Sequence, residues 1–358
     1  MVTAVDALAA DGRDVLTSGW PSDGLESLGA CPICGSPARE LLFSGLRDRI
    51  FRCAPGSWDL HACRDCGTGY LDPRPTSDTI HLAYQTYYTH KGNLSLPADQ
   101  LRGRRWLERV LANGYKNWKF GTDLQPSSRL GVLVTLLVPS LRSLLDRQFR
   151  HLPTAKRNGR VLDIGFGDAG FLENARAMGW TVVGTDLDPK VVEDAKRRGF
   201  DARVGTLEGV EGPFDAITMC HVIEHLHDPV AVLRTCHSLL APGGTIWLET
   251  PNLGASGLRE FGPYWRGLEP PRHLVLFNRD SIARALEEAG FTEVRDLRQP
   301  SVVWGMYVDS TRIRNGEDPY AAAPVSRRLK LQIKAVTLLE WIWKRRREFL
   351  AVTARKVS

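Results

Sequence analysis

The sequence predicts an α/β fold built on a mostly parallel sheet with helices on both faces. Residues 159–310 alternate short apolar runs with amphipathic segments, which is the pattern of strands and crossover helices in such a sheet. A chain of 358 residues is long enough for one large domain of this kind and smaller attachments. Its composition, 43% hydrophobic and 25% charged, is ordinary for a globular protein.

The first strand is expected at Arg160–Ile164, and it is followed by Gly165, Gly167 and Gly170. Glycines let the chain turn sharply and bring backbone N–H groups against a ligand at the start of a helix. Asp186 ends the next apolar run, where a carboxylate can accept hydrogen bonds from ribose hydroxyls. This spacing equally fits a nicotinamide dinucleotide, so it predicts a cofactor site without naming the cofactor.

Asp163 distinguishes between the two cofactor classes. A carboxylate two positions before the first glycine has no use beside a pyrophosphate, but it suits a cofactor with a positively charged amino-acid tail. Residues 214–220 and 242–250 provide two further strands, the second entered through a Pro-Gly-Gly turn. The order of these elements favours the cofactor with the charged tail.

The segments VLDIGFGDAGF, VVGTDLDP, FDAITMCHVIEHLHDP and LLAPGGTIWLETPN follow one another between residues 161 and 252. Together they resemble the core of class I S-adenosylmethionine-dependent methyltransferases. This resemblance implies a Rossmann-like, seven-stranded, mostly parallel sheet and S-adenosylmethionine as the cofactor.

The resemblance also implies individual roles. Asp163 and the glycines would line the methionine part of the cofactor, Asp186 would bind the ribose, and Leu187 would pack on the adenine. The segment 205–208 would approach the adenine edge. In full, the implied cofactor contacts are Asp163, Gly165, Gly167, Gly170, Asp186, Leu187, Leu207, Cys220 and His221.

A histidine-rich segment follows the fourth strand. His221, Glu224 and His225 fit the H-x-x-E-H motif of zinc peptidases, but Asp228-Pro229 leaves no room for the long helix which that motif needs. A hydroxyl or acidic carbon acceptor needs a general base, for which His225 and His273 are the candidates. Glu224 is a candidate to orient either ring, and equally a candidate to cap a helix. A histidine bonded to backbone beneath the pocket remains the alternative for His225, and no metal is assigned here.

Two CxxCG sequences precede the predicted sheet. Cys31 and Cys34 are separated from Cys63 and Cys66 by 28 residues. Each pair can form a knuckle with two thiolates aimed at one ion, so the four predict a structural Zn²⁺ in a small zinc-ribbon-like region. Paired CxxCG sequences ahead of a DPRP segment resemble a bacterial subgroup that includes sugar methyltransferases, which implies a small-molecule acceptor, with a sugar or nucleotide-linked sugar first.

Changes of pattern divide the chain into five regions. They are a loosely ordered N-terminus (1–28), the cysteine region (29–75), a helical lid or linker (76–158), the methyltransferase domain (159–310) and a basic helical extension (311–358). Within the last region, residues 326–358 contain ten Lys and Arg against two Glu, on a candidate amphipathic helix. Such a helix packs on its own domain, binds RNA or lies on an anionic membrane.

Seven cysteines, four of them in CxxC pairs, fit metal binding in a reducing compartment, and no signal peptide is visible in the first 30 residues. These observations predict a cytoplasmic protein. Two alternatives to a small-molecule enzyme stay open: an RNA methyltransferase that docks through the cysteine region and basic tail, and an inactive methyltransferase-like scaffold. Nothing in the sequence predicts the oligomeric state.

Overall fold

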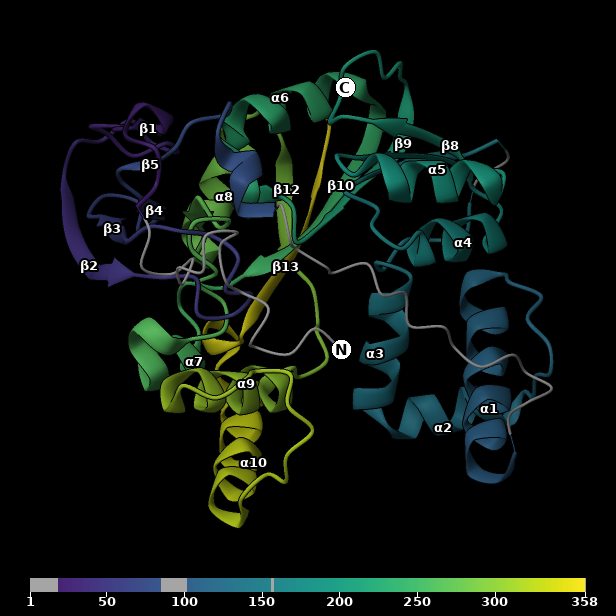
Figure 1. Ribbon diagram of the computed structural model, residues 1–358. Helices are drawn as coiled ribbons and strands as arrows, with labels where there is room; N and C mark the ends of the chain where they lie inside the picture. The colour runs from purple at the N-terminus through teal and green to yellow at the C-terminus, as the bar shows by residue number, and fades with distance from the viewer. Residues whose placement is uncertain (1–18, 85–101, 156–157, 358) are drawn as a thin grey trace.

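The largest element of the fold is a seven-stranded sheet with the strand order β12-β13-β10-β9-β6-β7-β8 (Figure 1). The computed structural model describes residues 19–84, 102–155 and 158–357. Strands β6 to β10 are parallel to one another, and β13 is antiparallel to both of its neighbours. The strands are β6 (Arg160–Ile164), β7 (Thr181–Asp186), β8 (Asp201–Val204), β9 (Phe214–Cys220), β10 (Leu240–Pro251), β12 (Thr292–Asp296) and β13 (Phe349–Arg355). The predicted seven-stranded, mostly parallel sheet is confirmed.

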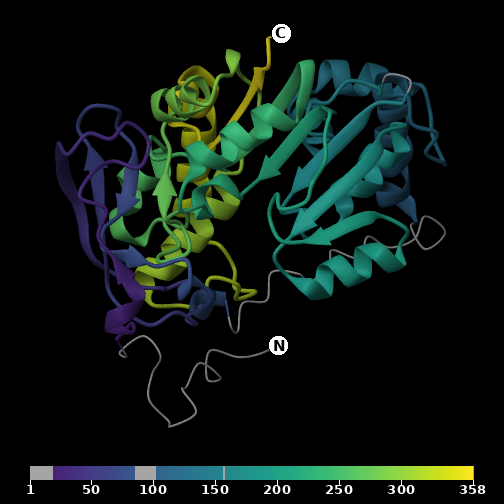
Figure 2. The same ribbon diagram turned by 90° about the horizontal axis from the view of Figure 1, so that it is seen from above.

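Helices cover both faces of this sheet (Figure 2). Side chains alternate along a strand, so Leu162 and Ile164 of β6 point into one hydrophobic cluster and Val161 points into the other. The first cluster includes residues of α6 (Pro229–Leu239) and α8 (Arg279–Glu288). The second includes residues of α4 (Gly170–Ala177) and α5 (Pro189–Arg197).

The segment ahead of β6, for which a helical lid or linker is predicted over residues 76–158, contains helices where the structure describes it; positions 85–101, 156 and 157 lie outside the described residues. Its helices are α1 (Gly103–Phe120), α2 (Leu130–Leu137) and α3 (Pro139–Gln148), preceded by the short η3 (Ile80–Tyr84). Phe120 and Phe149 stack with ring centroids 4.3 Å apart, and both belong to the cluster that includes α4. This packing places the end of α3 against the sheet.

The cysteine region forms a second sheet in the order β11-β4-β3-β2. One of its strands comes from the methyltransferase domain, because Val275 and Leu276 pair with Tyr70 and Gly69. The bounds are β2 (Arg39–Leu46), β3 (Trp58–Cys63), β4 (Gly69–Leu71) and β11 (Val275–Leu276), with β1 (Leu25–Glu26) pairing with β5 (Arg74–Pro75) beside it. The N-terminal region is therefore continuous with the loop that follows β10.

The C-terminal residues differ from the predicted division at residue 310. Phe349–Arg355 forms strand β13 between β10 and β12, so part of the expected helical extension belongs to the sheet. In the sequence the apolar residues of this strand directly follow a basic segment, so the pattern there predicts a basic helix and not a strand. The other elements here are α7 (Ser256–Phe261), η6 (Gly262–Tyr264), α9 (Val303–Asn315), α10 (Arg327–Ile342) and η7 (Lys344–Arg346). In the described part of the chain, every helix is too short or too polar to cross a membrane.

Candidate cofactor and acceptor site

The glycine turn lies at the carboxyl end of β6, at the edge where open α/β sheets bind ligands. Gly165 and Gly167 have φ values of +68° and +58°, which L side chains rarely adopt. A Cβ atom at position 165 would also collide with the Val222 side chain. Gly170 begins α4, and its N–H donates to the Asp168 carboxylate at 3.0 Å. The turn thus needs glycine for both its conformation and its packing.

Asp186 faces this turn from the end of β7. Its carboxylate accepts hydrogen bonds from the Gly167 and Asp188 N–H groups, each at 2.9 Å. Leu187, the next residue, is 72% exposed, so its side chain is free to pack on a flat ring. Leu207 is partly buried against the sheet cluster. The cofactor residues carried by β6 and β7 therefore lie along one edge.

Asp163 is fully buried beneath the turn. One carboxylate oxygen accepts hydrogen bonds from the Arg150 guanidinium and from the Thr218 hydroxyl. Burial raises the pKa of Asp163 and the Arg150 charge opposes that shift. The second oxygen, Oδ2, has no hydrogen-bond partner among the described residues. A buried carboxylate oxygen without a partner costs free energy, and the ammonium group of a cofactor tail would satisfy it.

Two arginines at the end of α3 complete this part of the site, and the sequence analysis missed them. Arg147 Nε donates to both carboxylate oxygens of Glu249, at 2.8 and 2.9 Å. Burial alone would raise the pKa of Glu249, but Arg147 and His221 lower it to about 2. Arg150 pairs with Asp163. No sequence signal links α3 to the strand ends, because these contacts depend on how the helix packs.

His221 lies between two carboxylates at the end of β9. Its Nδ1 is 3.3 Å from Glu224 Oε1, and its Nε2 is 3.3 Å from Glu249 Oε1. Burial alone would lower the pKa of His221, but Cys220, Glu224 and Glu249 raise it well above its usual value. The two carboxylates therefore favour the protonated form of His221 over the neutral form that a general base needs.

Glu224 is fully buried and bonded on both oxygens. Besides the contact with His221, it accepts a hydrogen bond from the Thr250 hydroxyl at 3.0 Å. Burial opposes ionisation, but His221 and the other nearby histidines lower the pKa of Glu224. Its carboxylate therefore orients His221 on the strand end.

His225 and His273 lie together with ring centroids 4.8 Å apart. His225 Nδ1 is 2.9 Å from the Arg272 carbonyl oxygen, and His273 Nδ1 is 2.9 Å from that of Gly267. A carbonyl only accepts, so each Nδ1 carries a proton, and the neutral form of each ring has its lone pair on Nε2. The Tyr84 hydroxyl oxygen is also 3.1 Å from His225 Nδ1. Burial lowers the pKa of His273 to about 4, although Glu269 opposes the shift. His273 is therefore neutral near pH 7.

The same pair can hold a metal ion together with Glu224. One ligand atom from each of Glu224, His225 and His273 lies within 4.8 Å of the other two. Two imidazoles and a carboxylate suit a divalent transition metal, and Nδ1–H bonds to carbonyls are the usual support for such ligands. No metal is predicted here from the sequence, because it shows no clear carboxylate besides Glu224 for such an ion.

The four cysteines of the N-terminal region also converge. The sulfur atoms all lie within 4.8 Å of one another in the group Cys31, Cys34, Cys63 and Cys66. The Cys31–Cys66 and Cys34–Cys63 sulfur distances are 3.6 and 3.4 Å, near the roughly 3.8 Å edge of a tetrahedron with Zn–S bonds of about 2.3 Å. The backbone repeats as well, because the N–H of the glycine after each pair, Gly35 or Gly67, donates to the carbonyl oxygen of the first cysteine of that pair, at 2.9 Å in both. These residues fit a tetrahedral ion.

The sheet order, the glycine turn after β6 and the acidic end of β7 define a class I S-adenosylmethionine-dependent methyltransferase domain. Residues 139–295 match the family model described as "Methyltransferase domain". The chain thus carries a methyltransferase domain of this class, and the class predicted from the sequence is confirmed.

The relatives share the domain only. A "Ubiquinone biosynthesis O-methyltransferase" of Xanthomonas campestris pv. campestris (strain B100) is 41% identical over 104 residues, which is 26% of this chain and 43% of that protein. The enzyme of the same name from Xanthomonas oryzae pv. oryzae (strain PXO99A) is 38% identical over 103 residues, with the same coverage. The chain thus spans less than half the length of these relatives. A SAM-dependent methyltransferase from Archaeoglobus fulgidus superposes with a TM-score of 0.42 at 20% identity, covering 63% of this chain and 99% of that one, a likeness too weak to add to the assignment.

Proposed function

We propose that this protein transfers a methyl group from S-adenosylmethionine to a hydroxyl oxygen of a small-molecule acceptor. The observation that carries the proposal is the juxtaposition of two half-sites at one sheet edge. The half-site on β6 and β7 offers an unsatisfied buried carboxylate oxygen at Asp163 and a second carboxylate at Asp186. The half-site after β9 and β10 offers two histidines whose Nε2 atoms keep their lone pairs.

S-adenosylmethionine fits the first half-site by its chemistry. The Asp163 carboxylate would hold the ammonium group of the methionine tail, and the Arg150 guanidinium beside it would meet the tail's carboxylate. Asp186 would accept from the ribose hydroxyls and Leu187 would cover the adenine. When bound, this cofactor supplies a methyl group on a positively charged sulfur.

The second half-site supplies the proton acceptor. A hydroxyl must lose its proton as its oxygen bonds to the methyl carbon and the carbon–sulfur bond breaks. We assign that proton to Nε2 of His225, which is only half-buried, with His273 as the neighbouring neutral imidazole. This assignment applies to the metal-free site, because an Nε2 bound to a metal ion has no lone pair for a proton. Cys220 and His221 would close the pocket beneath the sulfur, and Glu224 would fix the His221 ring.

Two acceptor classes are compatible with this site. The names of the Xanthomonas relatives favour a phenolic hydroxyl, and the paired CxxCG sequences favour a sugar or nucleotide-linked sugar. Incubation with isotopically labelled S-adenosylmethionine and either a catechol or a panel of nucleotide sugars, followed by mass spectrometry, tests the proposal. Labelled product from either panel supports it. Calorimetric binding of NAD in preference to S-adenosylmethionine would overturn it.

We also propose that the four cysteines hold a structural zinc ion. Four thiolates fill the tetrahedral coordination of zinc and leave no position for a substrate. The ion would fix β3 and β4, and thereby β11, since these strands share one sheet. Metal analysis of the purified protein is expected to find one zinc ion that a chelator removes.

A further inference from the structure

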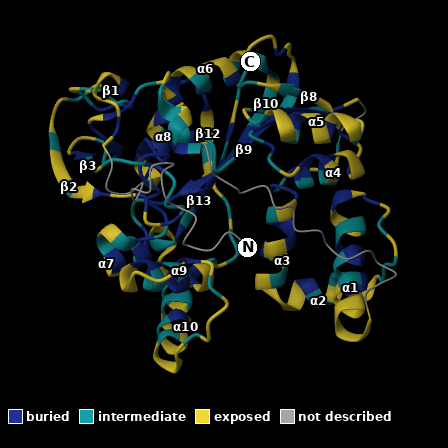
Figure 3. Cartoon of the chain, viewed as in Figure 1, coloured by how far each residue is buried: buried dark blue, intermediate teal, exposed yellow. Residues whose placement is uncertain are grey.

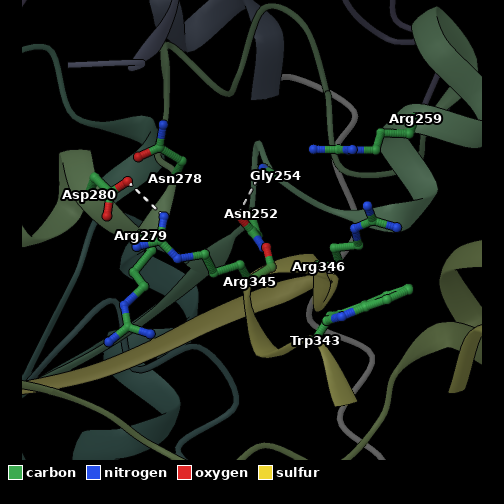
Figure 4. Close-up of a pocket in the computed structure, with 9 residues that line it drawn as sticks. All are labelled: Asn252, Gly254, Arg259, Asn278, Arg279, Asp280, Trp343, Arg345 and Arg346. Atoms are coloured by element: carbon green, nitrogen blue, oxygen red, sulfur yellow. Dashed lines mark hydrogen bonds and ion pairs between the residues drawn. The ribbon is translucent and has the colours of Figure 1, made fainter. Parts of the chain in front are cut away.

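A strongly basic pocket lies beside the acceptor half-site. It has a volume of 370 Å³, within the usual range for small-ligand sites. Four arginines and one aspartate line it, so the formal charge of its wall is +3. The lining residues are Asn252, Gly254, Arg259, Asn278, Arg279, Asp280, Trp343, Arg345 and Arg346 (Figure 4).

Two of these arginines have no ion-pair partner among the described residues. Arg345 pairs with Asp280 at 3.1 Å and Arg279 pairs with Asp296, which leaves Arg259 and Arg346. The Arg346 guanidinium lies 4.7 Å from the centre of the Trp343 ring, a contact that holds the charge at the pocket. Figure 4 shows the Arg259 and Arg346 side chains extending into the same part of the pocket from α7 and η7.

The pocket is connected to the acceptor half-site through β10. Asn252 donates to the carbonyl oxygens of Arg345 and Arg347, at 3.0 and 2.6 Å, and so fixes the arginine segment to the end of this strand. Thr250, which bonds to Glu224, lies two residues earlier on the same face. The wall of the pocket and the acceptor half-site are therefore both attached to the carboxyl end of β10.

We propose that this pocket binds a phosphate group carried by the acceptor. The inference rests on the proposed function. Unpaired guanidinium groups on two sides of a cavity suit the several oxygens of a phosphate or diphosphate. The start of α8, where Asn278 and Arg279 line the wall, adds the partial positive charge of a helix N-terminus. The Asp280 carboxylate opposes the anion but is already paired with Arg345.

The phosphate has two possible sources. It can belong to a water-soluble ester or to a lipid headgroup, because Trp341 and Ile342 next to the pocket are 67% and 57% exposed. Figure 3 shows such exposed residues on α10. An exposed tryptophan beside basic side chains is typical of a helix that rests on an anionic membrane surface.

Calorimetric titration with inorganic pyrophosphate tests the site in the full chain. We expect the wild type to bind it and added salt to weaken that binding. R259Q/R346Q is expected to weaken it about tenfold or more. R259K/R346K should retain most of the affinity. The matched control is R234Q on α6, an exposed arginine outside the pocket, which should change affinity by less than about twofold.

Vesicle binding distinguishes the sources. Vesicles of phosphatidylcholine with phosphatidic acid are compared with vesicles of phosphatidylcholine alone, in a sedimentation assay with the same variants. Pyrophosphate binding without vesicle binding identifies a soluble ester, and arginine-dependent binding to the anionic vesicles identifies a lipid. The proposal is overturned if neither probe binds, or if both bind R259Q/R346Q as well as the wild type. The affinity of R259Q/R346Q for S-adenosylmethionine should equal that of the wild type. If the proposed function is wrong, the wild type itself does not bind S-adenosylmethionine, and this result differs from a failure of the phosphate proposal.

Discussion

The two halves of the site are assembled in different ways. The cofactor half comes from a continuous stretch, in which Asp163, Gly165 and Gly167 lie within five residues and Asp186 ends the adjacent strand. The acceptor half joins the end of β9 to the loop that contains His273, and the cysteine region supports that loop from outside. Damage to a distant segment should therefore disable the acceptor half and leave the cofactor half intact.

Removal of one zinc ligand should have the largest effect, because it should disable the acceptor half and leave the cofactor half intact. Cys63→Ser leaves three thiolates, so the ion is expected to leave and the sheet β2-β3-β4-β11 to loosen. Because β11 directly follows the His273 loop, methyl transfer should fall below detection while S-adenosylmethionine affinity changes little. Zinc analysis, activity and calorimetry measure the three quantities. Cys236→Ala, which removes a buried thiol from α6, is the control and should retain zinc.

Substitution of the proposed proton acceptor should have the next largest effect. His225→Asn keeps a polar side chain but removes the basic nitrogen, so kcat should fall about a hundredfold or more. The affinity for S-adenosylmethionine should remain that of the wild type. Steady-state kinetics with an identified acceptor provide the measurement, and His81→Asn, on the exposed side of η3, is the control. Unchanged kcat in His225→Asn would move the base assignment to His273.

The reverse experiment disables the cofactor half. Asp186→Ala removes the carboxylate that would bind the ribose and that now holds the Gly167 N–H. S-adenosylmethionine binding should weaken by about 1–3 kcal/mol, as expected for a lost charge-assisted hydrogen bond. Calorimetry measures this directly, with Asp194→Ala on the exposed side of α5 as the control. Full affinity in Asp186→Ala would show that the ribose lies elsewhere.

The smallest expected effect is on the pH dependence of the free energy of unfolding, through the buried pair Glu340 and Glu348. Burial and the Glu348 charge raise the pKa of Glu340 to about 8, and burial raises the pKa of Glu348 to about 7. Between about pH 4.5 and 8 the folded chain thus binds more protons than the unfolded chain, so this pair destabilises the fold as pH rises. Glu340→Gln should be more stable than the wild type by about 1 kcal/mol at pH 8, with a smaller difference at pH 5.

Urea unfolding at the two pH values measures that difference. Glu317→Gln, an exposed substitution after α9, is the control and should follow the wild type at both. A constant offset between Glu340→Gln and the wild type would mean that the Glu340 carboxyl does not titrate in this range.

Local sequence is enough to place the proposed cofactor residues beside one another, because they lie on the turn between one strand and one helix and at the end of the adjacent strand. The predicted sheet, the helices on both faces and the convergence of the four cysteines followed from patterns of the same short range. The arginines at 147 and 150 could not be found this way, since only the packing of α3 brings them to the strand ends. The burial of Arg272 against Asp48 depends likewise on contacts between the cysteine region and the methyltransferase domain.

Strand β13 also has a consequence for how the protein is made. It pairs with β10 on one side and β12 on the other, so β12 reaches the sheet only through it. During synthesis the ribosome releases β6 to β10 well before Phe349–Arg355, and throughout that interval β10 presents an open edge of unpaired backbone groups. Such an edge can pair with another nascent chain. Translation speed and chaperone supply should therefore influence the yield of this protein.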